Sequence, residues 1–163
     1  DQAAGYLWRE GRAAAIAFAV LLTAAIGREA AIMVDLHPYQ YLAFDTLEGD
    51  EAGAYGKFEL DYWGTSYAEA TRKLNAYLDA EIPLARTPWV YVCGGNLSVG
   101  YYLRKEVRIV DDPYFADFYI DSDKTNPRCN GLFAGRGKVV AEVKRRGAVL
   151  STVVDLRPPK PTP

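Results

Sequence analysis

The hydrophobic positions of this chain form one long run near the N-terminus and only short runs after it. From Ala13 to Val34 a single charged pair, Arg28 and Glu29, interrupts the apolar sequence. A helix that crosses a bilayer needs roughly 20 predominantly apolar residues. Long charged side chains near one end of such a helix can reach water at headgroup depth. The pattern therefore predicts a membrane-anchor helix over residues 1–34.

Two other interpretations of this run remain open. It could be the apolar region of a secretory signal peptide, with Arg9 and Arg12 as its basic start, although residues 27–30 lack the small-x-small pattern of a cleavage site. It could also be an alanine-rich core helix of a soluble protein. If the run spans a membrane, the two arginines orient its N-terminal end toward the cytoplasm, and the rest of the chain is extracytoplasmic.

After residue 65 the apolar runs become short and change period. A helix is predicted from Ser66, where Ser66 and Glu69 match a capping box, to the break at Pro83. Runs of β-branched and aromatic residues predict strands at 89–93, 107–110, 115–121, 138–145 and 148–157, with a short helix at 96–102. The last two strands flank Arg146 and Gly147, and this spacing predicts a C-terminal β-hairpin.

Together these patterns predict an α/β chain, in which an N-terminal transmembrane helix is followed by a small α/β sandwich domain that ends in a β-hairpin. Half of the residues are hydrophobic, so a packed core is expected, and a net charge of -2 argues against a nucleic-acid binder. The predicted organisation is a membrane-anchor helix (1–34), an aromatic juxtamembrane collar (35–65), an extracytoplasmic α/β domain (66–157) and a disordered tail (158–163).

The collar, residues 35–65, combines aromatic rings with carboxylates, which suits a boundary between lipid and water. Within it, residues 39–44 and 57–64 are expected to be short extended pieces, and 46–56 a loop rich in glycine and acids. We expect eight collar residues to pack at the membrane interface: His37, Tyr39, Tyr41, Phe58, Glu59, Asp61, Tyr62 and Trp63.

Two segments of the collar, HPYQYLAF (37–44) and FELDYWGTSY (58–67), resemble a paired motif of bacterial family-39 polytopic membrane glycosyltransferases. These enzymes are relatives of the dolichyl-phosphate-mannose–protein mannosyltransferases. The matching positions are His37, Pro38, Tyr39, Gln40, Tyr41, Phe44, Phe58, Glu59, Leu60, Asp61, Tyr62, Trp63, Gly64, Ser66 and Tyr67. The later segments 116–120 and 147–156 are also similar to the small periplasmic α/β domain that follows the last membrane helix in this family.

The resemblance implies a location in the bacterial inner membrane, with the α/β domain in the periplasm and a polyprenyl-phosphate sugar as a neighbouring partner. The catalytic acids of that family lie in an early extracytoplasmic loop that has no counterpart among these residues. We therefore expect no catalytic residue, metal or cofactor in this chain by itself. Because the chain begins with Asp1 rather than Met, we expect a processed product or a piece of a longer chain.

A few collar residues could carry chemistry. His37 is the only histidine and is expected to be a helix-end hydrogen-bonding group rather than a catalytic base. Glu59 and Asp61 would share one face of a strand, as an acid/base or cation site requires. The alternative is that these two acids accept backbone N–H bonds near Tyr62 and Trp63.

Three features of the later domain have a functional and a structural interpretation. Asp121 and Asp123 form a DxD pair, but the following positions lack the glycine and glutamate of a calcium loop, so solvated acids are expected. The turn at residues 94–96 could present amides to an anion or could simply join a strand to a helix. Cys93 and Cys129 could form a disulfide in an oxidising compartment, or Cys93 could be a buried free thiol.

The C-terminal hairpin is rich in basic side chains. They are Arg136, Lys138, Lys144, Arg145 and Arg146. Such a cluster could meet anionic lipid or a lipid-linked phosphate, whereas charged residues on an edge strand are more commonly solvated.

Three functional hypotheses follow from the sequence. The first is a non-catalytic, membrane-anchored extracytoplasmic domain that resembles the C-terminal part of a lipid-linked-sugar glycosyltransferase. The second is a single-pass structural subunit whose helix packs against other transmembrane helices or subunits of a larger complex, which the small residues of 13–25 would favour. The third is a soluble hydrolase that uses Glu59 and Asp61.

Overall fold

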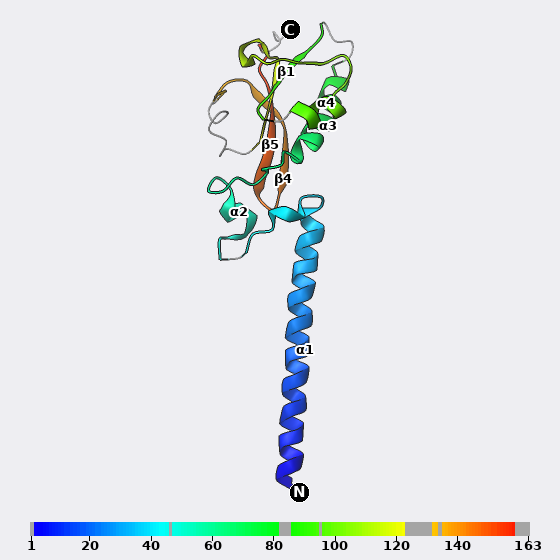
Figure 1. Cartoon of the computed structure of the whole chain (residues 1–163), viewed down its shortest axis with the longest axis vertical. Coiled ribbons are helices and arrows are strands. Elements are labelled where there is room, and N and C mark those ends of the chain that lie inside the picture. Colours follow the sequence, from blue (N-terminus) through cyan, green and yellow to red (C-terminus); the bar gives the residue numbers. More distant parts are fainter. Residues whose placement is uncertain are drawn as a thin grey trace. The chain divides into compact units, whose positions relative to one another are not determined.

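The computed structural model describes residues 2–45, 47–81, 86–94, 96–122, 132–133 and 135–158, with only the backbone of residues 2–10 and 96. The chain divides into two compact units, Asp1–Ala43 and Phe44–Pro163. Each unit is described by itself. The predicted fold class is confirmed: a long apolar N-terminal helix precedes a mixed five-stranded sheet with helices, and the sheet ends in a β-hairpin (Figure 1).

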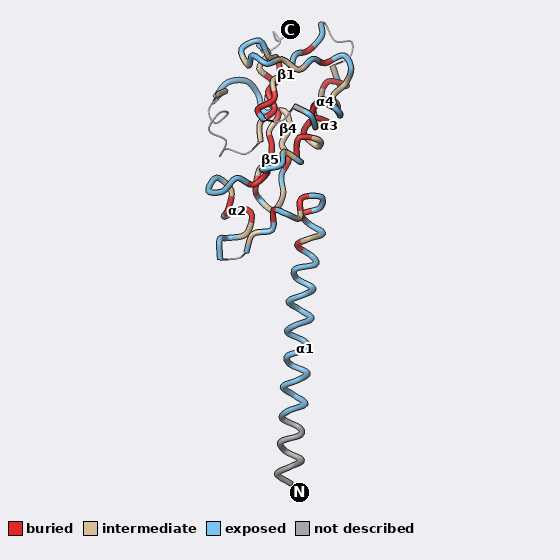
Figure 2. The backbone as a smooth tube through the Cα atoms, in the orientation of Figure 1, coloured by how far each residue is buried: buried red, intermediate tan, exposed pale blue. Residues whose placement is uncertain are grey.

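The first unit consists mainly of α1 (Gln2–Leu36). Among the described residues, its part Gly11–Leu36 is the one helix long and apolar enough to cross a membrane, with a mean hydropathy of 1.8. At 1.5 Å per residue this part is about 39 Å long, which exceeds the roughly 30 Å of a bilayer's hydrocarbon core. Most of its residues are exposed, as the pale blue of its tube in Figure 2 shows. A membrane span and a signal sequence share these properties.

A short 3-10 helix, η1 (Gln40–Leu42), follows the cis peptide bond between His37 and Pro38. The prediction of an extended piece at 39–44 was therefore wrong. The backbone N–H of Leu42 donates to the carbonyl of Tyr39 at 2.9 Å, so the tight turn satisfies its own polar groups without a strand partner.

The second unit is built on a sheet with strand order β2-β1-β3-β5-β4. Its strands are β1 (Trp89–Val92), β2 (Arg108–Ile109), β3 (Phe118–Ser122), β4 (Lys138–Arg145) and β5 (Ala148–Asp155). The first three strands run parallel, while β5 pairs antiparallel with both β3 and β4. Parallel neighbours need crossover connections, and α4 (Asn96–Tyr102) and η2 (Pro113–Phe115) lie in them. The hairpin of β4 and β5 turns at Arg146 and Gly147, as predicted.

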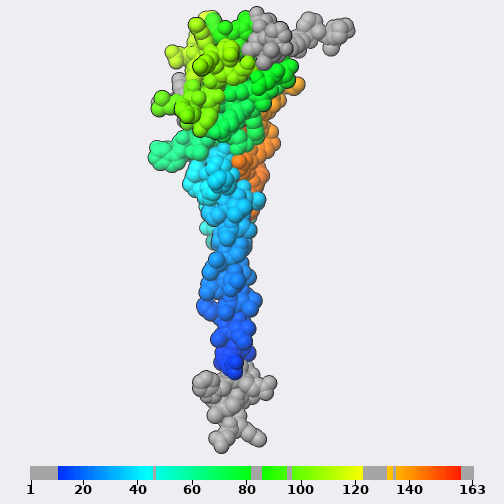
Figure 3. Space-filling view, turned by 90° about the vertical axis from the view of Figure 1, so that its right-hand side faces the viewer, coloured from blue at the N-terminus to red at the C-terminus, as the bar shows by residue number. Residues whose placement is uncertain are grey.

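Helix α3 (Ser66–Asp79) covers one face of this sheet. Its buried stripe includes Tyr67, Ala70, Leu74 and Leu78, which recur at the helical spacing predicted from the sequence. The green atoms of α3 lie against the orange atoms of β4 and β5 in the space-filling view (Figure 3). The strands contribute the remaining core residues, which are Val90, Phe118, Ile120, Val143, Leu150 and Val153.

The opposite face of the sheet carries a smaller apolar cluster. Cys93 and Tyr119 are buried there, and Tyr119 stacks on Tyr91 with ring centroids 5.9 Å apart. The ring of Phe133 meets Tyr119 edge-on at 4.8 Å. Aromatic pairs in these geometries stabilise a fold by about 0.5–1.5 kcal/mol beyond the area they bury. Both faces of the central strands are therefore covered.

Three local predictions were wrong in detail. Part of the expected loop 46–56 is a one-turn helix, α2 (Asp50–Ala54), and the expected extended piece 57–64 is irregular, with a single bridge between Tyr55 and Phe58. Thr65, not Ser66, is the N-cap of α3, and its side chain makes no capping hydrogen bond. The predicted tail, 158–163, lies outside the described residues apart from Pro158.

Gly137 makes the closest backbone approach in the sheet. It has φ +75°, and a Cβ there would lie 2.4 Å from the carbonyl oxygen of Asp155. Gly135 has a similar φ of +71°, but a Cβ there meets nothing within 4 Å. A substitution at either glycine would therefore strain the backbone to a similar extent. Only a side chain at position 137 would also clash with Asp155.

We predict that Gly137→Ala lowers the free energy of unfolding by about 2–4 kcal/mol, because the left-handed backbone costs about 1 kcal/mol and the clash with β5 adds about 1–3 kcal/mol. The matched change Gly135→Ala should cost only about 1 kcal/mol. Urea denaturation of both variants measures the difference. Equal losses would show that the contact with Asp155 is unimportant.

Candidate functional site

The structure separates the eight predicted collar residues by burial. Tyr39 and Asp61 are buried, with 1% and 2% of their surfaces exposed. The other six residues are exposed: His37, Tyr41, Phe58, Glu59, Tyr62 and Trp63. The collar is therefore not one uniform surface. Two of its members serve the interior of the chain, and the rest face outward.

His37 has the local role that its position predicts. Its Nδ1 lies 2.8 Å from the Nε2 of Gln40, one turn further along the chain. This contact joins the two ends of the short turn that follows α1. An imidazole engaged with an amide in this way differs from a general base, which normally faces a nucleophile or an acidic orienting group.

Asp61 is the N-terminal anchor of α3. Its carboxylate accepts hydrogen bonds from the backbone N–H of Thr65 and of Ser66, each at 2.9 Å, and from the Ser66 hydroxyl at 2.5 Å. These bonds satisfy backbone N–H groups of the first turn, which have no acceptor within the helix. The negative charge of Asp61 is also favourable there, because the helix dipole is positive at its N-terminus. Asp61 thus does what the Ser66–Glu69 capping box was predicted to do, while Glu69 pairs with Arg145 instead.

Glu59 and Asp61 lie in different surroundings. The segment that holds them is not a strand, and Glu59 is exposed while Asp61 is buried. A glycosidase needs two carboxyl groups that face one substrate space. The geometry favours the alternative from the sequence, in which backbone amides near the acid are its partners.

Exposed aromatic rings lie beside these acids. Tyr62 and Trp63 meet edge to face with centroids 5.2 Å apart, and Phe44 stacks on Phe58 at 5.7 Å. Trp63 keeps 76% of its surface exposed. Rings with an apolar body and a polar tip that stand out from a fold are typical of residues that contact lipid headgroups or another protein.

The basic residues near the hairpin turn are neutralised within the fold. Arg146 bonds through Nε to the buried Glu51 at 2.6 Å, and Arg145 bonds through Nη2 to Glu69 at 2.8 Å. Lys144 pairs with Glu142, its neighbour on β4, at 2.6 Å. The first two pairs join α2 and α3 to the hairpin. These three cations therefore have intramolecular partners and are not a free site for anionic lipid.

The β1 turn and the nearby cysteine are tied to α3. The Tyr67 hydroxyl donates to the carbonyl of Cys93 and lies 3.0 Å from the Ser122 hydroxyl, and burial raises the pKa of Tyr67 to about 12. Cys93 is disulfide-bonded in the structure. Its predicted partner Cys129 lies outside the described residues.

Other predicted sites fall partly outside the described structure. Asp123 and Gly95 are not described, so neither the DxD pair nor the 94–96 anion turn is visible as a whole. Within the described residues, no group of three or more His, Cys, Asp or Glu side chains is placed to hold a metal ion.

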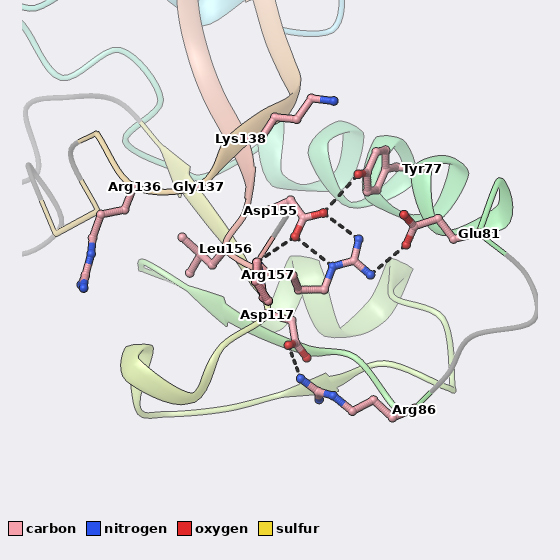
Figure 4. Close-up of a pocket in the computed structure, with 11 residues that line it drawn as sticks. Tyr77, Glu81, Arg86, Asp117, Arg136, Gly137, Lys138, Asp155, Leu156 and Arg157 are labelled. Atoms are coloured by element: carbon pink, nitrogen blue, oxygen red, sulfur yellow. Dashed lines mark hydrogen bonds and ion pairs between the residues drawn. The ribbon is translucent and has the colours of Figure 1, made fainter. Parts of the chain in front are cut away.

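A polar pocket that the sequence did not reveal lies at the N-terminal ends of β1 and β3. Its volume is about 970 Å³. It is lined by Tyr77, Glu81, Arg86, Asp117, Arg136, Gly137, Lys138, Asp155, Leu156, Arg157 and Pro158 (Figure 4). These residues come from the end of α3, the segments before β1 and β3, and both strands of the hairpin. Only tertiary folding brings such distant positions together.

Arg157 organises the centre of this pocket. Its guanidinium forms a two-bond pair with Asp155, at 2.9 and 2.6 Å, and a third bond to Glu81 at 2.8 Å. The same group stacks over the ring of Phe118 at 4.5 Å. The Tyr77 hydroxyl donates a further hydrogen bond to Asp155 at 3.1 Å. Such bidentate, stacked geometry is specific to arginine.

This network shifts the pKa values of its members. Burial by itself raises the pKa of Asp155, but the hydrogen bonds from Arg157 outweigh burial, so the net pKa lies below its usual range. Burial and the bond to Asp155 raise the pKa of Tyr77. The bonds to Asp155 raise the pKa of Arg157. Asp155 is therefore charged at neutral pH.

A second ion pair lies beside the first. Arg86 pairs with the buried Asp117, which also accepts the backbone N–H of Trp89 at 2.9 Å. Asp117 thereby holds the start of β1 next to β3. The sequence offered one weak signal for these acids: Asp117 and Asp155 interrupt otherwise apolar strand patterns.

We predict that Asp61→Ala lowers the free energy of unfolding by about 2 kcal/mol, because it leaves the first amides of α3 without an acceptor. Glu59→Ala, two positions away and exposed, should change stability by less than about 0.5 kcal/mol. Thermal unfolding followed by circular dichroism compares the two variants. A similar loss in both would contradict the capping role.

The low pKa of Asp155 predicts a pH dependence of stability. The folded state binds this proton less readily than the unfolded state, so the contribution of Asp155 is present above its unfolded pKa of about 4 and is lost as pH falls below that value. Between pH 7 and 3 the melting temperature of Asp155→Asn should therefore fall less than that of the native chain. Parallel curves would show that Asp155 does not contribute.

No protein-family model, curated protein or solved structure matches this chain. The glycosyltransferase resemblance therefore depends on the quoted motifs alone, and any function drawn from it is a proposal.

Proposed function

We propose that this chain is a non-catalytic, membrane-anchored extracytoplasmic domain, similar in plan to the C-terminal part of a lipid-linked-sugar glycosyltransferase. The observation that carries the proposal is the exposed apolar surface of α1. Leu21 and Val34, for example, keep 70% and 78% of their surfaces exposed. Each such side chain is stabilised by roughly 1.5–3 kcal/mol when it leaves water. The hydrocarbon core of a bilayer offers that environment over roughly 30 Å of the helix.

The orientation follows from charge. Arg9 and Arg12 precede the apolar run, and the excess of basic residues on the cytoplasmic side of a span is the general rule. With that end inside, the α/β domain lies on the outer side, which would be the periplasm if the membrane is the bacterial inner membrane. The disulfide at Cys93 supports an oxidising compartment.

The exposed part of the collar fits a place next to the bilayer. Phe58, Tyr62 and Trp63 are exposed rings in the segment that follows the helix, where aromatic residues commonly settle at headgroup depth. Glu59 beside them would face water. In the resembled enzymes this region lies near the entry of a polyprenyl-phosphate sugar, so such a lipid is a proposed neighbour.

The proposal includes no reaction. The acids that sequence analysis considered for catalysis are a helix anchor and an exposed side chain, and the cations at the hairpin turn are internally paired. If the resemblance is correct, chemistry belongs to other parts of a larger enzyme or complex. This domain would then seal or orient that assembly at the membrane surface.

One observation favours a second candidate function, a structural subunit of a membrane complex. Arg28 and Glu29 form an ion pair at 2.5 Å within the candidate span, about 7 Å along the axis from the middle of residues 13–34. Charged groups at that depth normally face other helices or water-filled space rather than lipid. Partner helices would therefore lie against this side of α1.

Two substitutions test the anchor prediction, and each replaces an apolar residue of α1 by arginine. Leu21→Arg places a charge in the middle of the span and should reduce membrane insertion by about 2.5–3.5 kcal/mol of apparent free energy. Val34→Arg, near the end, should have little effect, because its side chain can reach water. The fraction of chain that resists alkaline carbonate extraction measures both.

Two further measurements distinguish a membrane anchor from a cleaved signal sequence and determine on which side of the membrane the α/β domain lies. An epitope at the N-terminus should remain on the membrane-bound chain, whereas a cleaved signal would lose it. A Lys105→Cys variant should react with a membrane-impermeant maleimide in intact spheroplasts. Full carbonate extraction of the native chain, or equal behaviour of the two arginine variants, would overturn the anchor proposal.

A further inference from the structure

The pocket at the N-terminal ends of β1 and β3 carries more positive charge than its own ion pairs use. Its lining contains four cations and three acids. Asp155 and Glu81 are engaged by Arg157, and Asp117 is engaged by Arg86 and a backbone amide. The group of Arg157, Asp155 and Glu81 therefore keeps one negative charge, and the pair of Arg86 and Asp117 is neutral. The two remaining cations give the lining its net positive charge.

Arg136 and Lys138 are these remaining cations. Within the described part of the chain, neither side chain makes an ion pair or a hydrogen bond, and both are exposed at the pocket. The opposite end of the same hairpin is different, since Lys144, Arg145 and Arg146 all have acidic partners there. The hairpin therefore leaves its charge unbalanced at one end only, and that end lines the pocket.

Gly137 holds these two cations against the pocket. Because a Cβ at this position would lie 2.4 Å from the Asp155 carbonyl oxygen, only glycine lets the segment pack this closely on β5. A bulkier residue would displace this segment, and Arg136 and Lys138 with it, from β5. The backbone thus fixes where the segment that carries the two cations lies.

Arg86 supplies a third positive group. Its side chain is 62% exposed although it pairs with Asp117, so much of its guanidinium surface faces the solvent of the pocket. In the close-up, the Arg86 guanidinium points to Asp117, whereas the side chains of Arg136 and Lys138 extend outward from the Arg157 network (Figure 4). All three cations belong to the lining of the pocket.

We propose that this pocket binds an organic phosphate. Arginine forks and lysine ammonium groups are the usual protein partners of phosphate oxygens. Leu156, Pro158 and the ring of Tyr77 add apolar wall for a carbon skeleton. A volume of about 970 Å³ is at the upper end for small-molecule sites and far exceeds a bare phosphate ion. The inference is independent of the membrane-domain proposal.

The phosphate group could belong to a soluble metabolite or to a lipid headgroup, and two probes distinguish these sources. Glucose 6-phosphate represents a soluble phosphate ester, and dihexanoyl phosphatidic acid represents a lipid headgroup; glucose is the uncharged control. Isothermal titration of the full chain in a zwitterionic detergent should give saturable binding of at least one phosphate probe. The tighter of the two identifies the source, and glucose should not bind.

Two matched double variants test the contribution of Arg136 and Lys138 to binding. Arg136→Gln combined with Lys138→Gln should weaken binding at least tenfold. Lys57→Gln combined with Lys105→Gln removes the same charge from exposed positions outside the pocket and should weaken binding less than twofold. Unchanged melting temperatures confirm that both pairs fold. Absence of saturable binding by either phosphate probe, glucose binding as tight as glucose 6-phosphate, or equal weakening by both pairs would overturn the proposal.

Discussion

The α/β unit depends on how α3 is held over the sheet. Asp61 fixes the first turn of this helix through three hydrogen bonds, and the helix then lays its apolar stripe on the strands. Tyr67, one residue into the helix, reaches the carbonyl of Cys93 at the end of β1. At the other end Tyr77 and Glu81 join the Arg157 network. One helix thus links the collar, the ends of the parallel strands and the pocket.

Charge is distributed in the α/β unit so that the buried acids Glu51, Asp61 and Asp117 each have a charged or backbone donor. Glu51, 1% exposed, is paired with Arg146, and Asp117 with Arg86. Burying a carboxylate is costly unless a cation or several N–H groups replace its water. Arg146 meets this requirement at the hairpin turn, while Arg145 and Lys144 pair with the half-buried Glu69 and Glu142. Among the described residues, the side chains of Arg136 and Lys138 beside Gly137 have no such partner.

The first unit follows the opposite principle. Over Gly11–Leu36, helix α1 exposes most of its apolar side chains, which a water-soluble surface of that length would not do without a partner. A bilayer, or other helices within it, removes this cost. The Arg28–Glu29 pair then distinguishes lipid from protein surroundings. A charged pair is costly in contact with lipid, whereas neighbouring helices or a water-filled space can accommodate it. The helix itself is long and apolar enough for a membrane span or a signal sequence.

The sequence by itself determined the parts of this protein that depend on local pattern. The length of the apolar run, the stripe of α3, the β-branched strands and the Arg146-Gly147 turn all predicted elements that the structure contains, because hydrophobic period and turn chemistry act over a few residues. Tertiary structure decided what is not local. The cap came from Asp61 and not from Ser66 with Glu69, and Glu69 was needed by Arg145 across the fold. The pocket joins Glu81, Asp117 and Arg157, whose proximity depends on strand order, and no spacing along the chain encodes that order.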